Sequence, residues 1–531
     1  MMTVPVAVGD LVTIGARRHP HRVALRDRSG RERTYAELDE RTTRLANSLL
    51  GVGLAPGDRV SAWMGDVFEH VEVYLAAAKA GLVVAPINAR LAAPEAAHQI
   101  EDAGSRLLVW TSDLDSRVSQ MDQLGVIDGL VRVCVGVSLA AAAEDYEVFL
   151  SKGSSMPPDS EVDPSGVLIL GYTSGTTGRP KGAMLTHRGV VAIAAQNARS
   201  FRLAAYPEWI LTGSMSFVSV MPSHVMSAFR IGGTVTIMGR WDADDLVDAV
   251  RRNRGTFAYV PSPLLHDVTA AISRDPSTLD SVTSVLHSAS RADPEHLAAL
   301  HDVIGTRLVE GWGMTEHSGG LATATTESDY FVARRGARIF GSVGRSVVDA
   351  EVRVVDDRGD RLPHDGQSIG ELIVKSPALM KGYWRRPDAT AEVLRDGWYH
   401  TGDLGCITEE GYVSISERRT DLIVSGGANV YPSEVERCIG ELSEVREVAV
   451  VGAPHPRWGQ SVVAVVVLTH AGALSESAVI DHCRRQMAGF KKPSRVLFVD
   501  DLPRTTSLKV ARGELREVVA QLIAAEGFEP S

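Results

Sequence analysis

The sequence predicts an α/β protein with a large N-terminal domain of layered α/β subdomains, a β-rich subdomain and a small α+β C-terminal domain. The chain has 531 residues, which is too long for one ordinary hydrophobic core. Hydrophobic residues make up 44% of it and charged residues 23%, as in globular proteins in general. Apolar runs typical of strands alternate with helical spacings, which favours layered α/β structure.

The alternation begins near the N-terminus. Thr34 and Glu37 have the spacing of a capping box, so a helix is expected to start there. The runs RVSAWM (residues 59–64) and LVVAPIN (residues 82–88) predict strands, and HVEVYLAAAKAG (residues 70–81) between them predicts a helix. A strand–helix–strand order of this kind indicates a largely parallel sheet.

The pattern changes in the later part of the sequence. Residues 350–376 contain short apolar runs separated by Gly and Asp, which predicts a β-rich subdomain, and residues 405–415 predict a hairpin. A polar stretch at residues 416–421 is followed by strand and helix patterns of an α+β domain. We therefore expect a domain boundary that separates residues 1–420 from residues 421–531.

Composition and cysteine usage argue against several classes of function. The net charge of −11 disfavours nucleic acid as the main partner, because phosphate backbones are bound by basic surfaces. The four cysteines are widely spaced and form no CxxC pair, so neither a zinc site nor a disulfide framework is expected, and a cytoplasmic location fits best. The sequence shows no signal peptide and no apolar run of about 18 residues, so we expect no membrane span.

The segment YTSGTTGRPKGAMLTH (residues 172–187) is rich in Gly, Ser and Thr and contains two cations. It is predicted to join a buried strand at residues 166–171 to a helix at residues 187–200, with Thr186 as the helix N-cap. Such a loop suits polyphosphate, because glycines let backbone N–H groups approach the oxygens while hydroxyls and a lysine add hydrogen bonds and charge. A flexible surface loop is the alternative, and the segment does not match the Walker pattern.

Together with five later segments, this loop resembles the motifs of the acyl-adenylate-forming (AMP-binding) enzymes, which include acyl-CoA synthetases, fatty-acid–CoA ligases, adenylation domains of peptide synthetases and luciferases. The later segments follow the order of the family and extend the resemblance over nearly the whole chain: EGWGMTE (310–316), GELIVKSPALMKGYW (370–384), WYHTGDLG (398–405), ERRTDLIVSGGANVYPSEVE (417–436) and LPRTTSLKVAR (502–512). The resemblance implies a ligase that activates a carboxylic acid with ATP, releases pyrophosphate and passes the acyl group to coenzyme A. It also implies that the small C-terminal domain is mobile.

The resemblance further implies roles for individual residues. The phosphates of ATP would be held by the loop residues Thr173, Ser174, Gly175, Thr176, Thr177, Gly178 and Lys181. The rest of the nucleotide would be bound by Trp312, Gly313 and Met314 at adenine, Asp403 and Arg418 at ribose, and Thr315 at the α-phosphate. Glu316, with Thr173, would hold Mg²⁺, a cation that prefers carboxylate and phosphate oxygens. A solvated acid is the alternative for Glu316.

The resemblance implies that Lys509, which matches the family lysine near the C-terminus, catalyses adenylation, because its ammonium group would stabilise the charge that develops between the attacking carboxylate and the α-phosphate. The family resemblance implies a second pose of the C-terminal domain, in which Gly426 and Gly427 line a channel for the thiol and Asn429 contacts the adenylate. A surface lysine and a plain turn are the respective alternatives. Three positions depart from the family pattern: Thr420, Ala428 and Leu508.

The acyl pocket is expected to involve residues 213–229, GSMSFVSVMPSHVMSAF. This stretch has no acidic residue to pair with a substrate amine, so an apolar carboxylic acid (medium-chain, cyclic or aryl) is favoured over an α-amino acid. We interpret His224 within it as a packed or surface histidine. The residues expected to line the pocket are Phe217, Val218, Met221, Ser288, Ala289 and Gly311.

Coenzyme A is the expected acceptor, and Lys491 and Lys492 are either contacts for its nucleotide or a solvated pair. Two other functions are open: an adenylating enzyme that loads a separate acyl carrier protein, and a catalytically silent acyl-binding paralogue. Retention of the phosphate, magnesium and ribose residues and of Lys509 argues against the silent paralogue. The sequence leaves the identity of the acid open, and also whether the protein forms a homodimer.

Overall fold

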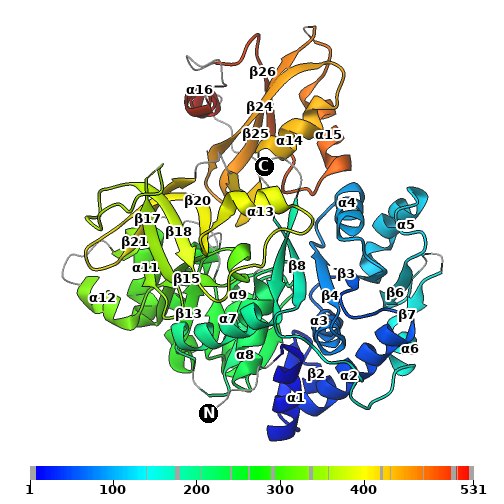
Figure 1. The fold of residues 1–531 in the computed structure, drawn as a ribbon. Coiled ribbons are helices and arrows are strands. Elements are labelled where there is room, and N and C mark those ends of the chain that lie inside the picture. Colours follow the sequence, from blue (N-terminus) through cyan, green and yellow to red (C-terminus); the bar gives the residue numbers. More distant parts are fainter. Residues whose placement is uncertain are drawn as a thin grey trace. The chain divides into compact units, whose positions relative to one another are not determined.

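The structure is a computed structural model, drawn in Figure 1. It describes residues 7–138, 140, 142–173, 180–203, 205–239, 242–260, 264–288, 294–333, 339–356, 358–418, 423–430, 432–470, 472–503, 510 and 512–525. The chain forms two compact units. The larger consists of Met1–Ala89, Gln99–Tyr172 and Gly182–Glu417, and the smaller of Arg90–His98, Thr173–Lys181 and Arg418–Ser531.

The first sheet has the order β7–β6–β5–β3–β4–β8–β9 within the described residues, and its strands from β7 to β8 pair in parallel. These strands are β3 (Arg59–Trp63), β4 (Val83–Ile87), β5 (Leu107–Thr111), β6 (Val131–Val135), β7 (Glu144–Asp145), β8 (Val167–Thr173) and β9 (Lys181–Thr186). The strands predicted at residues 59–64 and 82–88 are therefore confirmed. Their unbroken apolar runs fit a parallel sheet that is covered on both faces.

The second sheet has the order β16–β15–β14–β13–β12–β10–β11–β1–β2 in the described part of the chain. Its strands are β1 (Val23–Asp27), β2 (Glu32–Thr34), β10 (Glu208–Leu211), β11 (Thr234–Ile237), β12 (Phe257–Tyr259), β13 (Ser284–His287), β14 (Leu308–Gly313), β15 (Leu321–Ala324) and β16 (Arg345–Ser346). The strands from β14 to β1 in this order are parallel, whereas β15, β16 and β2 are antiparallel to their neighbours. The carboxyl ends of the parallel strands therefore meet at one edge.

The helices that accompany these sheets confirm the predicted starts. Thr34 Oγ1 accepts from the Glu37 backbone N–H at 3.2 Å and Glu37 Oε2 accepts from the Thr34 N–H at 2.7 Å, which is the capping box expected before α2. The helices are α1 (Gly9–Arg18), α2 (Tyr35–Gly51), α3 (Phe68–Ala80), α4 (Ala93–Ala103), α5 (Asp115–Gln123), α6 (Tyr146–Ser151), α7 (His187–Ser200), α8 (Met226–Arg230), α9 (Ala243–Asn253), α10 (Leu265–Arg274), α11 (Pro294–Ile304), α12 (Glu327–Ala333) and α13 (Pro387–Val393).

The connection predicted for residues 172–187 differs from the structure. The helix α7 begins at His187 with Thr186 as its N-cap, as expected, and Thr186 Oγ1 accepts from the Gly189 N–H at 3.0 Å. However, residues Lys181–Thr186 form β9, so the Gly/Ser/Thr-rich loop joins two strands instead of a strand and a helix.

A third sheet confirms the predicted β-rich subdomain. It has the order β17–β18–β20–β19, with β21 paired to β20. Its strands are β17 (Glu351–Val355), β18 (Gly370–Lys375), β19 (Leu394–Arg395), β20 (Trp398–Ile407) and β21 (Val413–Arg418). The hairpin expected at residues 405–415 is the connection from β20 to β21. One face of this sheet packs in a cluster that includes Val354, Leu372 and Trp312.

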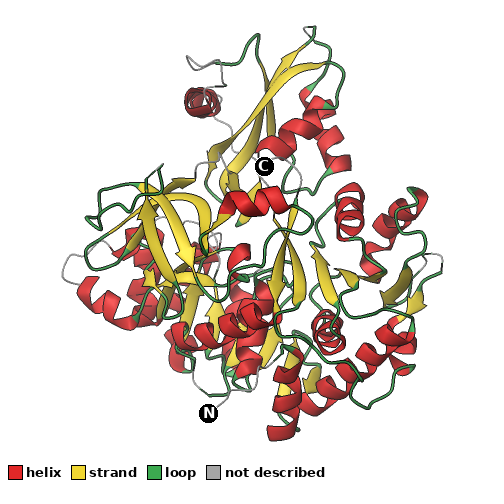
Figure 2. Ribbon diagram, viewed as in Figure 1, coloured by secondary structure: helices red, strands yellow, loops and turns green. Residues whose placement is uncertain are grey.

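The smaller unit is an α+β layer structure, as the alternation in its sequence predicts. Its sheet has the order β23–β22–β25–β24, with β26 paired to β25. Alternate residues of β25 face two cores: Val462, Ala464 and Val466 pack with α14 and α15, and Val463, Val465 and Val467 pack with α16. Figure 2 shows these helices on opposite sides of the sheet. The elements are β22 (Ile423–Ser425), β23 (Ala428–Val430), α14 (Pro432–Gly440), β24 (Val445–His455), β25 (Gly459–Leu468), α15 (Glu476–Gln486), β26 (Arg495–Phe498) and α16 (Arg512–Ala525).

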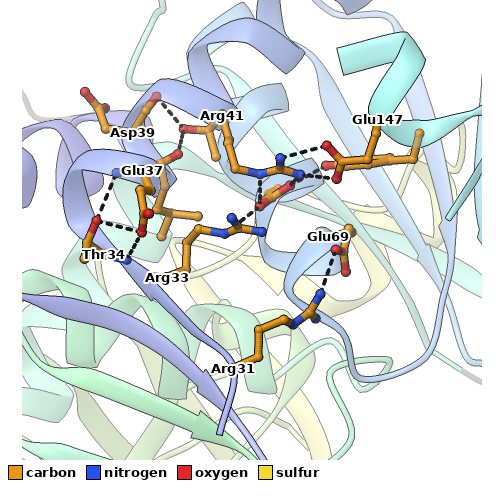
Figure 3. Close-up of polar contacts among 12 residues, drawn as sticks. Arg31, Arg33, Thr34, Glu37, Asp39, Arg41, Glu69 and Glu147 are labelled. Carbon is orange, nitrogen blue, oxygen red and sulfur yellow. Dashed lines mark hydrogen bonds and ion pairs between the residues drawn. The ribbon is translucent and has the colours of Figure 1, made fainter. Parts of the chain in front are cut away.

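A buried ion-pair network connects three helices of the larger unit. Arg41 of α2 donates to Glu72 of α3 through Nε (2.7 Å) and Nη2 (2.9 Å), and it reaches Glu147 of α6 at 2.6 and 2.8 Å (Figure 3). The Glu72 side chain is fully buried, and Tyr146 Oη donates to its Oε2 at 2.8 Å. Burial, reinforced by the charge of Glu72, holds the pKa of Tyr146 well above its usual range. The Glu72 carboxylate is thus stabilised by a bidentate guanidinium and a phenol.

Substitution of Arg41 tests this network. Arg41→Met leaves a buried carboxylate without its main counter-charge, so the free energy of unfolding in urea should fall by about 3 kcal/mol. Arg44 lies on the same helix and pairs with Glu40 at 2.9 Å near the surface. Arg44→Met should therefore change the free energy of unfolding by no more than about 1 kcal/mol. Equal losses in the two variants would contradict the network's role.

Candidate active site

Most of the described residues that were predicted to form the site lie at the carboxyl edge of the second sheet or directly beyond it. Phe217, Val218 and Met221 follow β10, Ser288 follows β13, and Thr315 and Glu316 follow β14. Ligands of open parallel sheets bind beyond the carboxyl ends of the strands. The topology therefore brings segments that are about 100 residues apart in sequence to one edge.

Trp312 and Asp403 are in direct contact. Trp312 of β14 donates its indole Nε1–H to Asp403 Oδ2 of β20 at 3.0 Å. Both residues are buried, at 6% and 5% exposure. The sequence assigned them to adenine and ribose separately, and the structure shows that the edge of the ring also fixes the carboxylate. A nucleoside bound here would meet an aromatic surface and a carboxylate that are already oriented toward one another.

Glu316 is held by a residue to which the sequence assigned no role. Tyr383 Oη donates to Glu316 Oε1 at 2.8 Å, and the Met380 N–H donates to the Glu316 carbonyl at 2.7 Å. Tyr383 also bonds to Tyr399, whose pKa burial raises well above its usual range with a further contribution from the charge of Glu316. The sequence could have indicated a role for Tyr383, because this residue lies in the family motif at residues 370–384. The solvated-acid alternative for Glu316 is wrong, since the residue is only 8% exposed.

The short 3₁₀ helix Thr315–His317 is anchored through His317. His317 is fully buried, and its Nδ1–H donates to the Gly320 carbonyl at 3.2 Å while its Nε2 accepts from Ser376 Oγ at 2.8 Å. Burial lowers the pKa of His317 to about 4, so the ring is neutral at pH 7. Both ring nitrogens are satisfied, which fixes the backbone that carries Thr315 and Glu316.

Gly171, near the end of β8, allows the acyl stretch to approach Thr315. A Cβ on Gly171 would lie 2.7 Å from Val218 Cγ1 and 2.9 Å from Thr315 Cγ2, so only glycine fits there. Val218 was predicted to line the acyl pocket and Thr315 to contact the α-phosphate. The glycine therefore marks where the two predicted subsites meet. The sequence alone predicts Gly171 only as the last residue of a strand.

The acyl stretch is held at its start by an acid from another segment. Asp66 Oδ1 accepts from Ser214 Oγ at 3.0 Å and from the Met215 N–H at 2.7 Å. The stretch itself has no acid, as noted from the sequence, but a carboxylate does reach it. Because this carboxylate is engaged by the protein, it does not alter the preference for an apolar acyl group. Further along, Met221–Val225 forms a π-helix, a distortion that is frequent at functional sites.

A buried polar pair lies on the neighbouring strands β13 and β14. His287 Nδ1 and Glu310 Oε2 are 2.5 Å apart, and burial raises the pKa of Glu310 above its ordinary value although His287 opposes this shift. A Cβ on Gly311 would lie 2.5 Å from Leu321 Cδ1 of β15, and the predicted role of Gly311 in lining the acyl pocket stays a prediction. Ser288 accepts through its carbonyl from Tyr259 Oη at 3.4 Å.

Several predicted residues lie in the smaller unit or outside the described residues. Thr173 Oγ1 donates to the Lys181 carbonyl at 3.5 Å across the ends of β8 and β9. For Arg418 and Asn429 only the backbone is described, in β21 and β23. The following predicted residues lie outside the described part of the chain: Ser174, Gly175, Thr176, Thr177, Gly178, Ala289 and Lys509. The departures Thr420 and Leu508 lie outside it too, whereas Ala428 is buried in β23.

Gly426 and Gly427 form the turn between β22 and β23. Their φ angles are 57° and 76°, in the left-handed region that favours glycine, and a Cβ on Gly426 would lie 2.9 Å from Trp458 Cε3. The interpretation of the two glycines as a turn is confirmed, and their role in a thiol channel stays a prediction.

The described residues contain neither a metal-binding cluster of side chains nor a candidate membrane span. No three His, Cys, Asp or Glu side chains gather there in a way that would hold a metal ion by themselves. In the same residues, no helix combines the length and the apolar character that a bilayer crossing requires.

The fold and the site define an α/β protein in which an indole and a carboxylate are hydrogen-bonded to each other beyond the carboxyl edge of a sheet. Family models identify it further: residues 13–384 match the AMP-binding enzyme model and residues 434–509 match the AMP-binding enzyme C-terminal domain model. The chain belongs to the AMP-binding enzyme family. The family assignment and the α/β fold class expected from the sequence are both confirmed.

Proteins whose names indicate different acyl acceptors are similar to this chain over nearly its full length. A feruloyl-CoA synthase of Amycolatopsis sp is 35% identical over 94% of this chain and 96% of its own. A fatty acid–[acyl-carrier-protein] ligase, ScoC, of Streptomyces coeruleorubidus is 33% identical over 92% of each chain. The structure of the amide bond synthetase McbA from Marinactinospora thermotolerans superimposes with a TM-score of 0.87 at 27% identity, covering 97% of this chain and 99% of that chain.

The hydrogen bond to Glu316 can be tested by Tyr383→Phe. The variant keeps the ring and removes the donor to a buried carboxylate, so the free energy of unfolding should fall by about 1–3 kcal/mol in urea titrations. Tyr206, which is 43% exposed, provides the matched control, because Tyr206→Phe should change stability by less than about 0.5 kcal/mol. Indistinguishable stabilities for Tyr383→Phe and the parent protein would show that the bond contributes nothing.

Proposed function

We propose that the protein is an ATP-dependent, AMP-forming acid–thiol ligase. It would convert an apolar carboxylic acid and ATP to an acyl-AMP and pyrophosphate, and then form an acyl-CoA thioester with release of AMP. The observation that carries this proposal is the Trp312–Asp403 contact at the carboxyl edge, within a chain that matches the AMP-binding family models at both ends. The proposal places the domain boundary at residues 420–421.

The proposed binding of the nucleoside relies on Trp312 and Asp403, whose side chains are already oriented by a hydrogen bond between them. The indole of Trp312 offers a flat face for adenine, and Asp403 accepts hydrogen bonds from the ribose hydroxyls, with Arg418 as a second ribose contact. Asp403 has its carboxylate oxygen Oδ2 bound to the indole, which fixes the position of the other oxygen. Little ordering of side chains is then needed when the nucleoside binds, and this preorganisation favours affinity.

The phosphate end combines a carboxylate, hydroxyls and a cation. Glu316 suits Mg²⁺ that is bound together with ATP, because such an ion takes one or two carboxylates and completes its shell with phosphate oxygens and water. When bound, the ion would neutralise phosphate charge. Tyr383 keeps the Glu316 carboxylate in place, Thr315 and Thr173 offer hydroxyls, and Lys181 with the loop from Ser174 to Gly178 would bind the β- and γ-phosphates.

Adenylation requires two anions to react, so positioning and charge stabilisation dominate the barrier. The carboxylate oxygen of the acid attacks the α-phosphorus and pyrophosphate leaves. Lys509 would bridge the attacking carboxylate and the α-phosphate as charge shifts between them. The thiolate of coenzyme A would then attack the acyl carbon of the mixed anhydride, and AMP would leave with the electron pair of the C–O bond.

Coenzyme A is the acceptor we favour, and an acyl carrier protein is the second candidate because ScoC, a relative of equal coverage, is named for one. The catalytically silent paralogue is disfavoured by the intact indole–carboxylate and carboxylate–phenol pairs. Lys491 is unsuited to contact coenzyme A, because it is buried and bonded to Glu434 Oε1 at 2.7 Å. Lys492 stays a candidate for that contact.

The reaction is tested by acid-dependent release of pyrophosphate. The purified protein, ATP, Mg²⁺ and a panel of aliphatic, cyclic and aryl acids should give pyrophosphate with at least one class of acid. Addition of coenzyme A should then yield AMP and an acyl-CoA, whereas a phosphopantetheinyl carrier protein should remain unacylated. A carrier thioester without acyl-CoA would favour the second candidate, and the absence of any acid-dependent pyrophosphate would contradict both.

The role of Lys509 separates the two half-reactions. Lys509→Ala should slow pyrophosphate release about 10²–10³-fold, in line with the loss of one group that stabilises a transition-state charge. Thioester formation from chemically prepared acyl-AMP should be nearly unchanged in the same variant. Lys152→Ala, a change at an exposed lysine, serves as the control. Normal adenylation by Lys509→Ala would refute the assignment.

A further inference from the structure

His224 is a packed histidine, as the sequence suggested, but its ring has no polar partner. It is 6% exposed, its Nδ1 is sealed from solvent, and neither ring nitrogen makes a hydrogen bond with the described residues. A buried polar atom without a partner destabilises the folded protein and is uncommon in native structures. A ligand that supplies the missing hydrogen bond would remove this cost.

The surroundings hold the ring firmly. His224 lies in the π-helix Met221–Val225, edge-on to Trp209 (centroids 5.4 Å apart) and to Tyr259 (5.3 Å). The preceding residue, Ser223, donates through Oγ to the Gly319 carbonyl at 2.6 Å and accepts at its carbonyl from Asn197 Nδ2 at 3.1 Å. The imidazole is therefore fixed by its neighbours although no hydrogen bond of its own holds it.

Its position is at the acyl end of the proposed site. Tyr259, which contacts the His224 ring, donates from Oη to the carbonyl of Ser288, a predicted pocket residue. Val220 and Tyr259 both flank Gly213, since a Cβ there would lie 3.4 Å from Val220 Cγ2 and 3.6 Å from Tyr259 Cδ1. From Val218, which adjoins Thr315 at Gly171, the same segment continues six residues to His224.

We propose that His224 is a specificity-determining residue, and that it hydrogen-bonds a hydroxyl group on the distal part of an aryl carboxylic acid. This inference rests on the proposed function and names the class of acid that the site takes. Tyr259, which lies edge-on to the His224 ring, offers an aromatic contact for an aryl group, whereas Trp209 and Phe257 are fully buried and pack on one another with their centroids 4.0 Å apart. A hydroxyl both donates and accepts, as does a neutral imidazole.

The charge of the site supports a neutral partner. Burial lowers the pKa of His224 to about 3, so the ring is uncharged at neutral pH. A second carboxylate or an ammonium group on the acyl part would be desolvated beside an uncharged ring, which is unfavourable. Aryl acids with a distal hydroxyl should therefore be better substrates than their unsubstituted or dicarboxylic counterparts.

The test compares matched pairs of acids, 4-hydroxycinnamate with cinnamate and 4-hydroxyphenylacetate with phenylacetate, by acid-dependent pyrophosphate release. For the parent protein, kcat/KM should be at least ~10-fold higher for the hydroxylated acid of at least one pair. In His224→Leu this preference should fall to about 1, and in His224→Gln, which keeps a hydrogen-bonding group, part of it should return. Removal of an unpaired polar group should leave the urea stability of ligand-free His224→Leu equal to or above that of the parent.

A second packed histidine provides the control. His301 is buried and its ring stacks on Tyr330 with the centroids 4.9 Å apart. His301→Leu should alter kcat/KM for both members of a pair by the same factor. Turnover of both acids without a preference, or an equal loss for both acids in His224→Leu, would overturn the inference and leave the proposed function intact. No pyrophosphate release with any acid would overturn the proposed function and this inference with it.

Discussion

One hydrogen bond, from Trp312 Nε1 to Asp403 Oδ2, joins the second, mostly parallel sheet to the β-rich sheet at the candidate site. Trp312 is placed by the register of β14 against β15, in which Gly311 and Gly313 allow close approach of the neighbouring backbone. Asp403 is placed by β20. Because both groups are buried, separation of the two sheets here would leave an indole N–H and a carboxylate unsatisfied. In the function we propose, the relative position of the adenine and ribose contacts depends on this pair.

Other buried polar side chains of the candidate site are also hydrogen-bonded within the protein. The Glu316 carboxylate is bonded to Tyr383, and both nitrogens of His317 are bonded to neighbouring residues. In the segment that follows β14, the polar side chains of Glu316 and His317 are therefore held by neighbouring residues. Against this background the unpaired ring of His224 is distinctive, since its Nδ1 is buried without a partner among the described residues.

The comparisons separate what the family shares from what varies within it. Relatives of similar coverage are named for coenzyme A, for a carrier protein and for amide formation. These names differ in the group that receives the acyl part. In the function we propose, the groups at the sheet edge act in activation of the acid, so they support activation more strongly than any one acceptor.

The sequence by itself determined the α/β class, the capping box before α2, the strands β3, β4 and β8 of the first sheet, the β-rich region and the family, because each depends on local periodicity or on a contiguous motif. It was wrong about the loop after β8, where residues Lys181–Thr186 extend a sheet instead of leading straight into a helix: the choice depends on pairing with β8, which no local pattern encodes. Tyr383, Gly171, Asp66 and the unpaired ring of His224 were decided only by the tertiary structure. Their roles arise from contacts between residues that are distant in sequence, and such contacts exist only when the chain is folded.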